Sequence, residues 1–100
     1  MRINQLPDRD IHRFFQCVLQ LDNMDECYAF FDDLMTLKEM KVFITRFTVA
    51  EMLLEGKTYQ EIREVTQAST AIISRVKRSI EEGNDSYKIL LDRVKKYNEE

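Results

Sequence analysis

Apolar residues recur along most of the chain at the spacing of one face of an α-helix. In residues 8–21, for example, they fall at i, i+3, i+4, i+7 and i+8. The chain has two Gly and one Pro, too few for the turns that separate short strands. The pattern therefore predicts an all-α fold. Six helices are predicted, over Asp8–Leu21, Met24–Met35, Leu37–Glu55, Tyr59–Val65, Thr70–Glu82 and Ser86–Asn98.

Capping residues mark where these helices begin and end. Asn23, Thr36, Thr58 and Ser69 are of the types whose side chains accept hydrogen bonds from the free N–H groups of a first helical turn. Both Thr residues are followed three positions later by Glu, which is the spacing of a capping box. Gly56 follows the third helix, where a positive φ is favoured. No linker or repeat interrupts the chain, so we predict one domain over residues 1–100.

Residues 58–82 have the spacing of a helix-turn-helix motif. A short helix is followed by a turn at Thr66–Ala68 and by a longer helix that Ser69 caps. Ile62 and Val65 of the short helix are predicted to be buried against one face of the longer helix. The apolar residues of that face are Ile73, Val76 and Ile80.

The turn departs from the usual pattern of this motif in two places. Gln67 stands where Gly is favoured because φ is positive, and Arg63 stands where a small residue usually lets the two helices approach. A non-Gly residue in the left-handed conformation costs about 1 kcal/mol. We therefore predict some backbone strain, or a slightly wider angle between the helices.

The opposite face of the longer helix is small, hydroxylic and cationic. Small side chains let a helix enter the major groove of DNA, and Arg can bond guanine O6 and N7 together or grip a phosphate. Ile72 borders this face and is suited to contact a thymine methyl. The free N–H groups that begin the short helix, with Tyr59 and Gln60, are suited to clamp a phosphate. The predicted DNA-binding residues are Thr58, Tyr59, Gln60, Ser69, Thr70, Ala71, Ile72, Ser74, Arg75, Lys77 and Arg78.

The net charge of −3 conceals a gradient along the chain. Residues 1–56 carry 6 basic and 10 acidic side chains, residues 57–80 carry 5 and 2, and residues 81–100 carry 4 and 6. Only the middle segment is therefore positive, and Ser69 to Ile80 contains no acid. Because charges more than about 10 Å away are screened at 0.1 M salt, this local block can bind a polyanion although the whole chain is acidic.

Aromatic residues are concentrated in the first half of the chain. Seven of the ten are found there: Phe14, Phe15, Tyr28, Phe30, Phe31, Phe43 and Phe47. Adjacent aromatics point about 100° apart on a helix, so they need cover on two sides. A small domain buries only about 60–65% of its unfolded surface, so we infer that a second copy supplies the cover and that the protein is a homodimer. The alternative is that both Phe pairs fit inside a monomer core.

Other functional classes have little support. No apolar run approaches the ~18 residues of a membrane span, and Met1–Leu21 lacks the order of a signal peptide, so we expect a cytoplasmic protein without a membrane partner. Cys17 and Cys27 lack CxxC spacing and His12 is the only His, so no zinc site is predicted and both cysteines are expected to be reduced. No Gly-rich phosphate loop or facing carboxylate pair indicates an enzyme, and no cofactor is predicted.

The segment EMLLEGKTYQEIREVTQASTAIISRVKRSIEEGNDSY, Glu51–Tyr87, resembles the YerC/YecD family of Trp-repressor-related bacterial proteins. The resemblance extends over nearly all 100 residues. Its most specific pieces are Gly56–Ile62, Ala68–Ala71, Ile73–Val76 and Gly83–Asp85. The resemblance implies a six-helix subunit that interlocks with its twin through helices in residues 1–56. The helix-turn-helix in residues 58–82 would then form two reading heads for a palindromic operator, and residues 86–98 would form a C-terminal helix.

The resemblance also implies a candidate effector pocket. Thr36, Arg46 and Arg75 match, in spacing, a threonine and two arginines that line the co-repressor pocket of the Trp repressor. The next residue there is a Gly against the bound indole, whereas it is Val76 here. A β-branched side chain would fill part of that space, so tryptophan is not expected as the ligand. An effector of other identity stays open, as do simpler functions: a helix cap for Thr36, an ion pair for Arg46 and a phosphate contact for Arg75.

Two classes of function follow from these residues. The first is a homodimeric, sequence-specific transcriptional regulator that binds double-stranded DNA with the helix of residues 69–82 in the major groove. The second is a protein-interaction module of the transcription machinery, in which the same cationic surface binds an acidic partner without specific DNA binding. The acidic remainder of the chain favours the second class, because Asp and Glu near the groove repel DNA.

Overall fold

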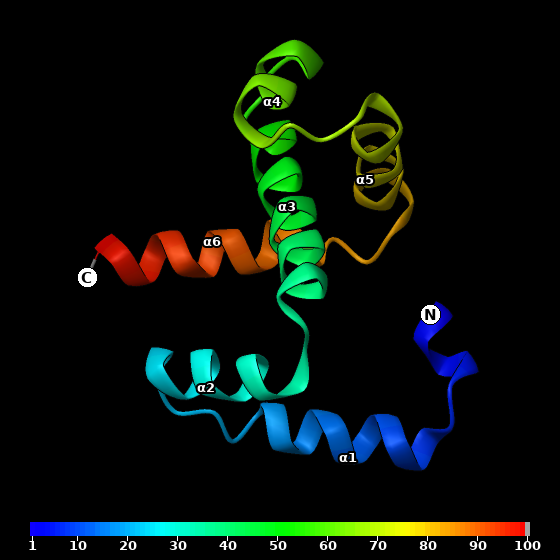
Figure 1. Ribbon diagram of the computed structural model, residues 1–100, viewed down its shortest axis with the longest axis vertical. Coiled ribbons are helices and arrows are strands. Elements are labelled where there is room, and N and C mark those ends of the chain that lie inside the picture. The colour runs from blue at the N-terminus through cyan, green and yellow to red at the C-terminus, as the bar shows by residue number, and fades with distance from the viewer. Residues whose placement is uncertain (100) are drawn as a thin grey trace. The chain divides into compact units, whose positions relative to one another are not determined.

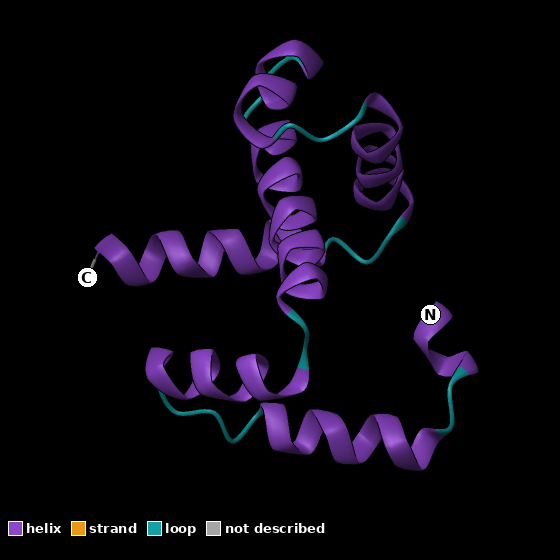
Figure 2. Ribbon diagram, in the orientation of Figure 1, coloured by secondary structure: helices purple, strands orange, loops and turns teal. Residues whose placement is uncertain are grey.

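A computed structural model describes residues 1–99 of the chain, and every regular element in them is a helix (Figure 2). The elements are η1 (Arg2–Gln5), α1 (Asp8–Val18), α2 (Met24–Leu34), α3 (Leu37–Leu54), α4 (Tyr59–Thr66), α5 (Thr70–Glu82) and α6 (Ser86–Glu99). The predicted all-α fold with six α-helices is confirmed. The short 3₁₀ helix η1 was not predicted from the sequence.

The predicted N-caps of α2, α4 and α5 are made by side chains. Asn23 Oδ1, Thr58 Oγ1 and Ser69 Oγ each accept from the backbone N–H three residues later, at 2.8, 3.2 and 3.2 Å. The cap of α2 has a return bond, because Glu26 Oε1 accepts from the N–H of Asp22 at 2.8 Å. Each cap satisfies a backbone donor that a first helical turn leaves free, which is why these helices begin where they do.

The first helix is shorter than predicted. It ends at Val18, and the N–H groups of Gln20 and Leu21 bond to carbonyls three residues back, at 3.0 and 3.1 Å. Such three-residue bonds tighten the end of a helix and turn the chain. The prediction that this helix extends to Leu21 is therefore wrong by one turn, and Leu19 is 80% exposed.

The chain divides into two compact units, and the first of them is Met1–Leu37. Its helices α1 and α2 contact each other through aromatic rings, with the centroids of Phe14 and Phe30 6.2 Å apart. Neither helix contains a buried residue. This unit therefore has apolar side chains but no enclosed core of its own.

The second unit begins at Lys38, and it contains the buried core of the described chain. The core joins the second half of α3 to the helix-turn-helix, which consists of α4, the turn and α5 (Figure 1). Its buried members come from α3, α4, the turn and α5: Val49, Ala50, Ile62, Ala68, Ile73 and Val76. Ile80 of α5 and Tyr87 of α6 pack against this cluster and are partly buried.

One residue that was predicted to lie in the core is exposed. Val65 is 67% exposed, whereas Ile62 is fully buried. The inner face of α4 contains Tyr59, Ile62 and Thr66, which lie at i, i+3 and i+7 and are buried or half-buried. Val65 lies about 60° from Ile62 on the other flank of this face, so rotation of the short helix toward Tyr59 leaves it in solvent.

Glycine follows α3, the helix before the motif, and α5, the second helix of the motif. Gly56 has φ of 82°, and the N–H groups of Gly56 and Lys57 bond to the carbonyls of Leu53 and Met52, which forms a Schellman motif at the end of α3. Gly83 is the C-cap of α5, and this position favours Gly because a Cβ there would collide with the carbonyl oxygen of Ser79.

Gln67 in the turn has φ of 61° and ψ of 14°, the left-handed conformation that the motif requires. Its N–H bonds to the carbonyl of Arg63 at 2.8 Å, so the conformation satisfies a free carbonyl at the end of α4. The positive φ predicted for this non-Gly position is therefore present.

Replacing Gln67 with Gly should raise the free energy of unfolding by about 0.5–1 kcal/mol, because Gly adopts positive φ without a Cβ penalty. Chemical denaturation at one fixed protein concentration measures it. Gln67→Ala, which keeps the Cβ, is the control and should give no such gain. Gly56→Ala should lower the free energy by a similar amount through backbone strain alone, since a Cβ there meets nothing within 4 Å. Equal stabilities of the Gly and Ala variants at position 67 would contradict this account.

Candidate nucleic-acid interface

Helix α5 has one face in the core and one face in solvent. Ile73 and Val76 are 0% and 3% exposed, so they fix the rotation of the helix about its axis. The outer residues Ala71, Ser74, Arg75 and Arg78 are all exposed, and so are Thr70, Ile72 and Lys77. The cationic face that the sequence predicts is therefore available to a partner of the subunit.

Side-chain hydrogen bonds fix the turn before α5. Thr66 Oγ1 donates to the carbonyl oxygen of Ile62 at 2.8 Å and accepts from the N–H of Ala68 at 3.1 Å. Ala68 is 5% exposed and packs into the core. Thr66 and Ala68 thus set the direction in which the chain enters α5. This function of Thr66 was not predicted, although its hydroxyl at the end of a short helix is a signal for such back-bonding.

A second link joins α4 directly to the exposed face of α5. The hydroxyl oxygen of Tyr59 lies 3.5 Å from Ser74 Oγ. Tyr59 is half-buried and packs against the core, whereas Ser74 is exposed. The structure therefore brings together two residues, 15 positions apart, that were each predicted to bind DNA.

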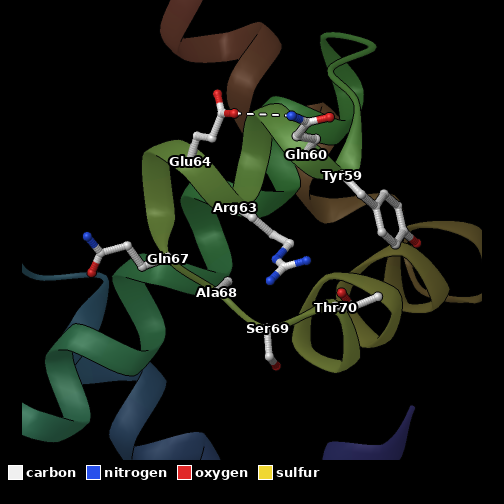
Figure 3. A pocket seen from close by; sticks show the side chains of 8 residues that line it. All are labelled: Tyr59, Gln60, Arg63, Glu64, Gln67, Ala68, Ser69 and Thr70. Carbon is white, nitrogen blue, oxygen red and sulfur yellow. Dashed lines mark hydrogen bonds between the residues drawn. The ribbon is translucent and has the colours of Figure 1, made fainter.

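An open groove lies between α4 and the start of α5 (Figure 3). Its lining residues are Tyr59, Gln60, Arg63, Glu64, Gln67, Ala68, Ser69 and Thr70. The Arg63 side chain extends from α4 toward the first turn of α5 (Figure 3). From the sequence, Arg63 was predicted only to be a bulky residue where the two helices approach. Its spacing of four residues from Tyr59 and three from Gln60 places all three on one side of α4, and that signal was missed.

All five cations of residues 57–80 are exposed: Lys57, Arg63, Arg75, Lys77 and Arg78. The two acids of this segment, Glu61 and Glu64, both lie on α4. Gln60 Nε2 donates to Glu64 Oε1 at 3.4 Å, which holds that carboxylate along α4 (Figure 3). The exposed face of α5 therefore has cations and hydroxyls without an acid among its residues before Glu81.

The residues of the predicted effector pocket divide between the two units. Thr36 is exposed and belongs to the first unit, whereas Arg46, Arg75 and Val76 belong to the second. Arg46 is half-buried on α3 and Arg75 is exposed on α5. Val76 is a member of the buried core, so its side chain contacts the cluster that holds α5 in place.

Two other kinds of site are absent from residues 1–99. Within residues 1–99, no group of three or more His, Cys, Asp or Glu side chains is arranged to hold a metal ion. None of the helices described is both long and apolar enough to cross a membrane.

Comparisons with known proteins agree with this geometry. Residues 9–95 match the family described as Trp repressor protein. The chain is 48% identical over 95 residues to the uncharacterized protein YerC of Bacillus subtilis (strain 168), covering 95% of this chain and 91% of that protein. A crystal structure of a Trp repressor candidate from Staphylococcus aureus superimposes with a TM-score of 0.91 at 45% identity over 95% of each chain. A TrpR-like protein from Eubacterium eligens ATCC 27750 gives a TM-score of 0.87 at 45% identity, covering 91% of this chain and 94% of that one.

Two adjacent isoleucines test which face of α5 is buried. Ile73→Ala should lower the free energy of unfolding by about 2–5 kcal/mol, because it removes a fully buried side chain and leaves a cavity. Ile72→Ala, at a side chain that is 39% exposed, should cost less than about 1 kcal/mol. Urea denaturation followed by circular dichroism measures both. Losses of equal size would mean that the rotation of α5 is not the one described.

Proposed function

Because this chain belongs to the Trp repressor family, we propose that it is a sequence-specific DNA-binding transcriptional regulator that acts as a homodimer. The observation that carries the proposal is the division of α5 into a buried apolar face and an exposed face of small, hydroxylic and cationic side chains. Such a helix can lie in the major groove, which is about 12 Å wide, without losing its contacts with the core.

The exposed face of α5 has the chemistry for reading base edges. Arg75 and Arg78 each have a planar fork of donors that fits O6 and N7 of guanine, and this pairing distinguishes guanine from the other bases. Ala71 leaves space for close approach of the helix to the groove. Ile72 offers an apolar surface that suits the methyl group of thymine.

Residues at the start of both helices are suited to bind the phosphate backbone. The first turn of α4 has free N–H groups, and Thr58 caps it while Tyr59 and Gln60 flank it. Phosphate contacts of this kind fix the register of a protein on DNA without reading sequence. We assign the same function to Lys77 and to Arg63, which projects into the groove beside these residues (Figure 3). Ser69 and Thr70, at the start of α5, complete this set.

The homodimer is supported by apolar surface that one subunit leaves in solvent. Helices α1 and α2 have no buried residue, and α3 leaves Phe43, Ile44 and Phe47 40–56% exposed. An exposed apolar area of this extent marks an interface in a protein that remains in solution. A two-fold symmetric pair would present two copies of α5, and half-sites about 34–36 Å apart would match them.

We propose that tryptophan is not the effector. Val76 is packed in the core, so the position that would accommodate an indole ring contains a β-branched side chain with 3% exposure. Moving that side chain would weaken the contacts that hold α5, at a cost of the same order as a core substitution. Operator binding should therefore proceed without tryptophan.

One observation favours a second function. The whole chain is acidic, with a net charge of −3, although the motif itself is positive. A protein-interaction module would use the same exposed face to bind an acidic partner protein. That function predicts little DNA affinity at about 150 mM salt and a stable complex with a partner, so a DNA titration separates the two.

The regulator should select a symmetric consensus from a random pool of duplexes. On that duplex, Arg75→Ala and Arg78→Ala should each lower affinity by about 1–3 kcal/mol where the side chain meets a base. Where it meets a phosphate, the slope of log K against log salt should fall by about one unit instead. Fluorescence anisotropy at several salt concentrations measures both quantities. The same titration with millimolar tryptophan should give an unchanged affinity.

Arg93→Ala is the matched control, since it removes one exposed Arg of α6 and changes the net charge equally. It should change neither the affinity nor the slope by a comparable amount. If the Arg75→Ala, Arg78→Ala double variant bound every tested DNA as the wild type does, α5 would not be the recognition helix.

The purified protein should have twice the 12.0 kDa mass of one chain at micromolar concentration. The reason is the exposed apolar surface of α1, α2 and α3, which water alone would cover in a monomer. Size-exclusion chromatography with light scattering gives the mass directly. A stable species of 12.0 kDa would end the homodimer proposal.

A further inference from the structure

Tyr59 and Ser74 form a bridge of two hydroxyl groups between α4 and the exposed face of α5, with 3.5 Å between their oxygens. We propose that Tyr59 is a positioning residue, whose hydroxyl holds that of Ser74 so that the pair donates one hydrogen bond to an acceptor on DNA. This inference rests on the proposed function and adds to it a contact that helps to distinguish one DNA sequence from another. The acceptor is the N7, O6 or O4 atom of a base in the major groove.

The two hydroxyl groups together have a hydrogen left over for one further hydrogen bond. Each hydroxyl has one hydrogen and two lone pairs, and the bond between Tyr59 and Ser74 uses one of the two hydrogens. Whichever residue donates, one hydrogen stays free to point away from the pair. An acceptor on DNA orders the pair into a chain of two bonds, and bonds in such a chain strengthen each other. The pair can therefore donate one hydrogen bond to an acceptor atom at its position.

Other hydroxyls in this unit behave differently from that of Ser74. Ser79, on the same helix, donates to the carbonyl oxygen of Arg75 at 3.2 Å, and Thr66 donates to that of Ile62 at 2.8 Å. Both bonds turn the hydroxyl back to a carbonyl four residues earlier, as is common for Ser and Thr in helices. Tyr59 offers Ser74 a competing partner on another helix. A hydroxyl that bonds to Tyr59 is held at the exposed face of α5.

The ring of Tyr59 can hold Ser74 because it is anchored. Tyr59 packs against the buried core and is half-buried, so the position of its hydroxyl is set by contacts that do not involve DNA. A group whose position is fixed before binding loses less conformational entropy when it binds. Because α4 is packed on the core, the bridge holds a hydrogen-bond donor in a fixed position on α5.

Tyr59→Phe and Ser74→Ala test the bridge, because each removes one hydroxyl and Phe retains the ring that packs on the core. Affinity is measured for the selected duplex and for an unrelated duplex of equal length, and their ratio is the readout. Each single variant should lower the ratio by about three- to tenfold, the usual range for one hydrogen bond. The double variant should lose little more than either single one, because both remove the same bridge. The melting temperature of Tyr59→Phe should stay near that of the wild type.

Ser79→Ala is the matched control, since it also removes a Ser hydroxyl from α5, but one that is bonded to the helix backbone. It should leave the ratio unchanged. An unchanged ratio in Tyr59→Phe, or single losses that multiply in the double variant, would overturn the inference while the regulator proposal stands. Equal weakening of both duplexes with a lower melting temperature would show a purely structural tyrosine and would overturn it too. A wild-type protein without sequence preference would instead overturn the proposed function, and the inference with it.

Discussion

The packing of Ile73 and Val76 against Ile62 and the second half of α3 is the contact on which the rest of the second unit depends. These residues are almost fully buried, and each such side chain contributes about 1.5–3 kcal/mol relative to exposure. Because side chains on a helix are 100° apart, burial of two positions fixes where all the others point. Ala71, Ser74, Arg75 and Arg78 are exposed for that reason, so the apolar core determines the chemistry of the exposed face.

Hydrogen bonds within the turn help to place α5 so that it packs against the core. The bond from Gln67 to Arg63 and the two bonds of Thr66 satisfy backbone groups that a helix end leaves free. They also require a left-handed Gln67, which costs about 1 kcal/mol. The buried Ala68 offsets this cost, because its methyl group closes the core between α4 and α5. The conformation of the turn is thus set by the packing around it, and not by the preference of Gln67 itself.

The sequence was sufficient for the helices and for the two faces of α5, because caps and periodicity are local signals. Asn23, Thr58 and Ser69 marked starts that the structure has, and Gly56 marked an end. Val65 was wrongly placed in the core because a helix of two turns has too few apolar residues to define the direction of its inner face. The bridge from Tyr59 to Ser74 joins residues 15 positions apart, and no spacing rule within one helix predicts it. The groove position of Arg63 was missed for a related reason, since it depends on where α5 begins relative to α4.

The contrast between the two units bears on how a small acidic protein could bind DNA in the proposed manner. The first unit has a surplus of acids and no buried residue in α1 or α2, whereas the motif has the core and a surplus of cations. If the first unit is covered by a second copy, each dimer has two positive motifs on an otherwise acidic protein. Screening limits the repulsion between distant acids and phosphates to about 10 Å at 0.1 M salt, so the local cations dominate at the contact. The same acids would still weaken binding to DNA that approaches in other orientations. In the proposed regulator, negative charge outside the motif would therefore favour binding through α5, because it disfavours DNA contacts made by other surfaces.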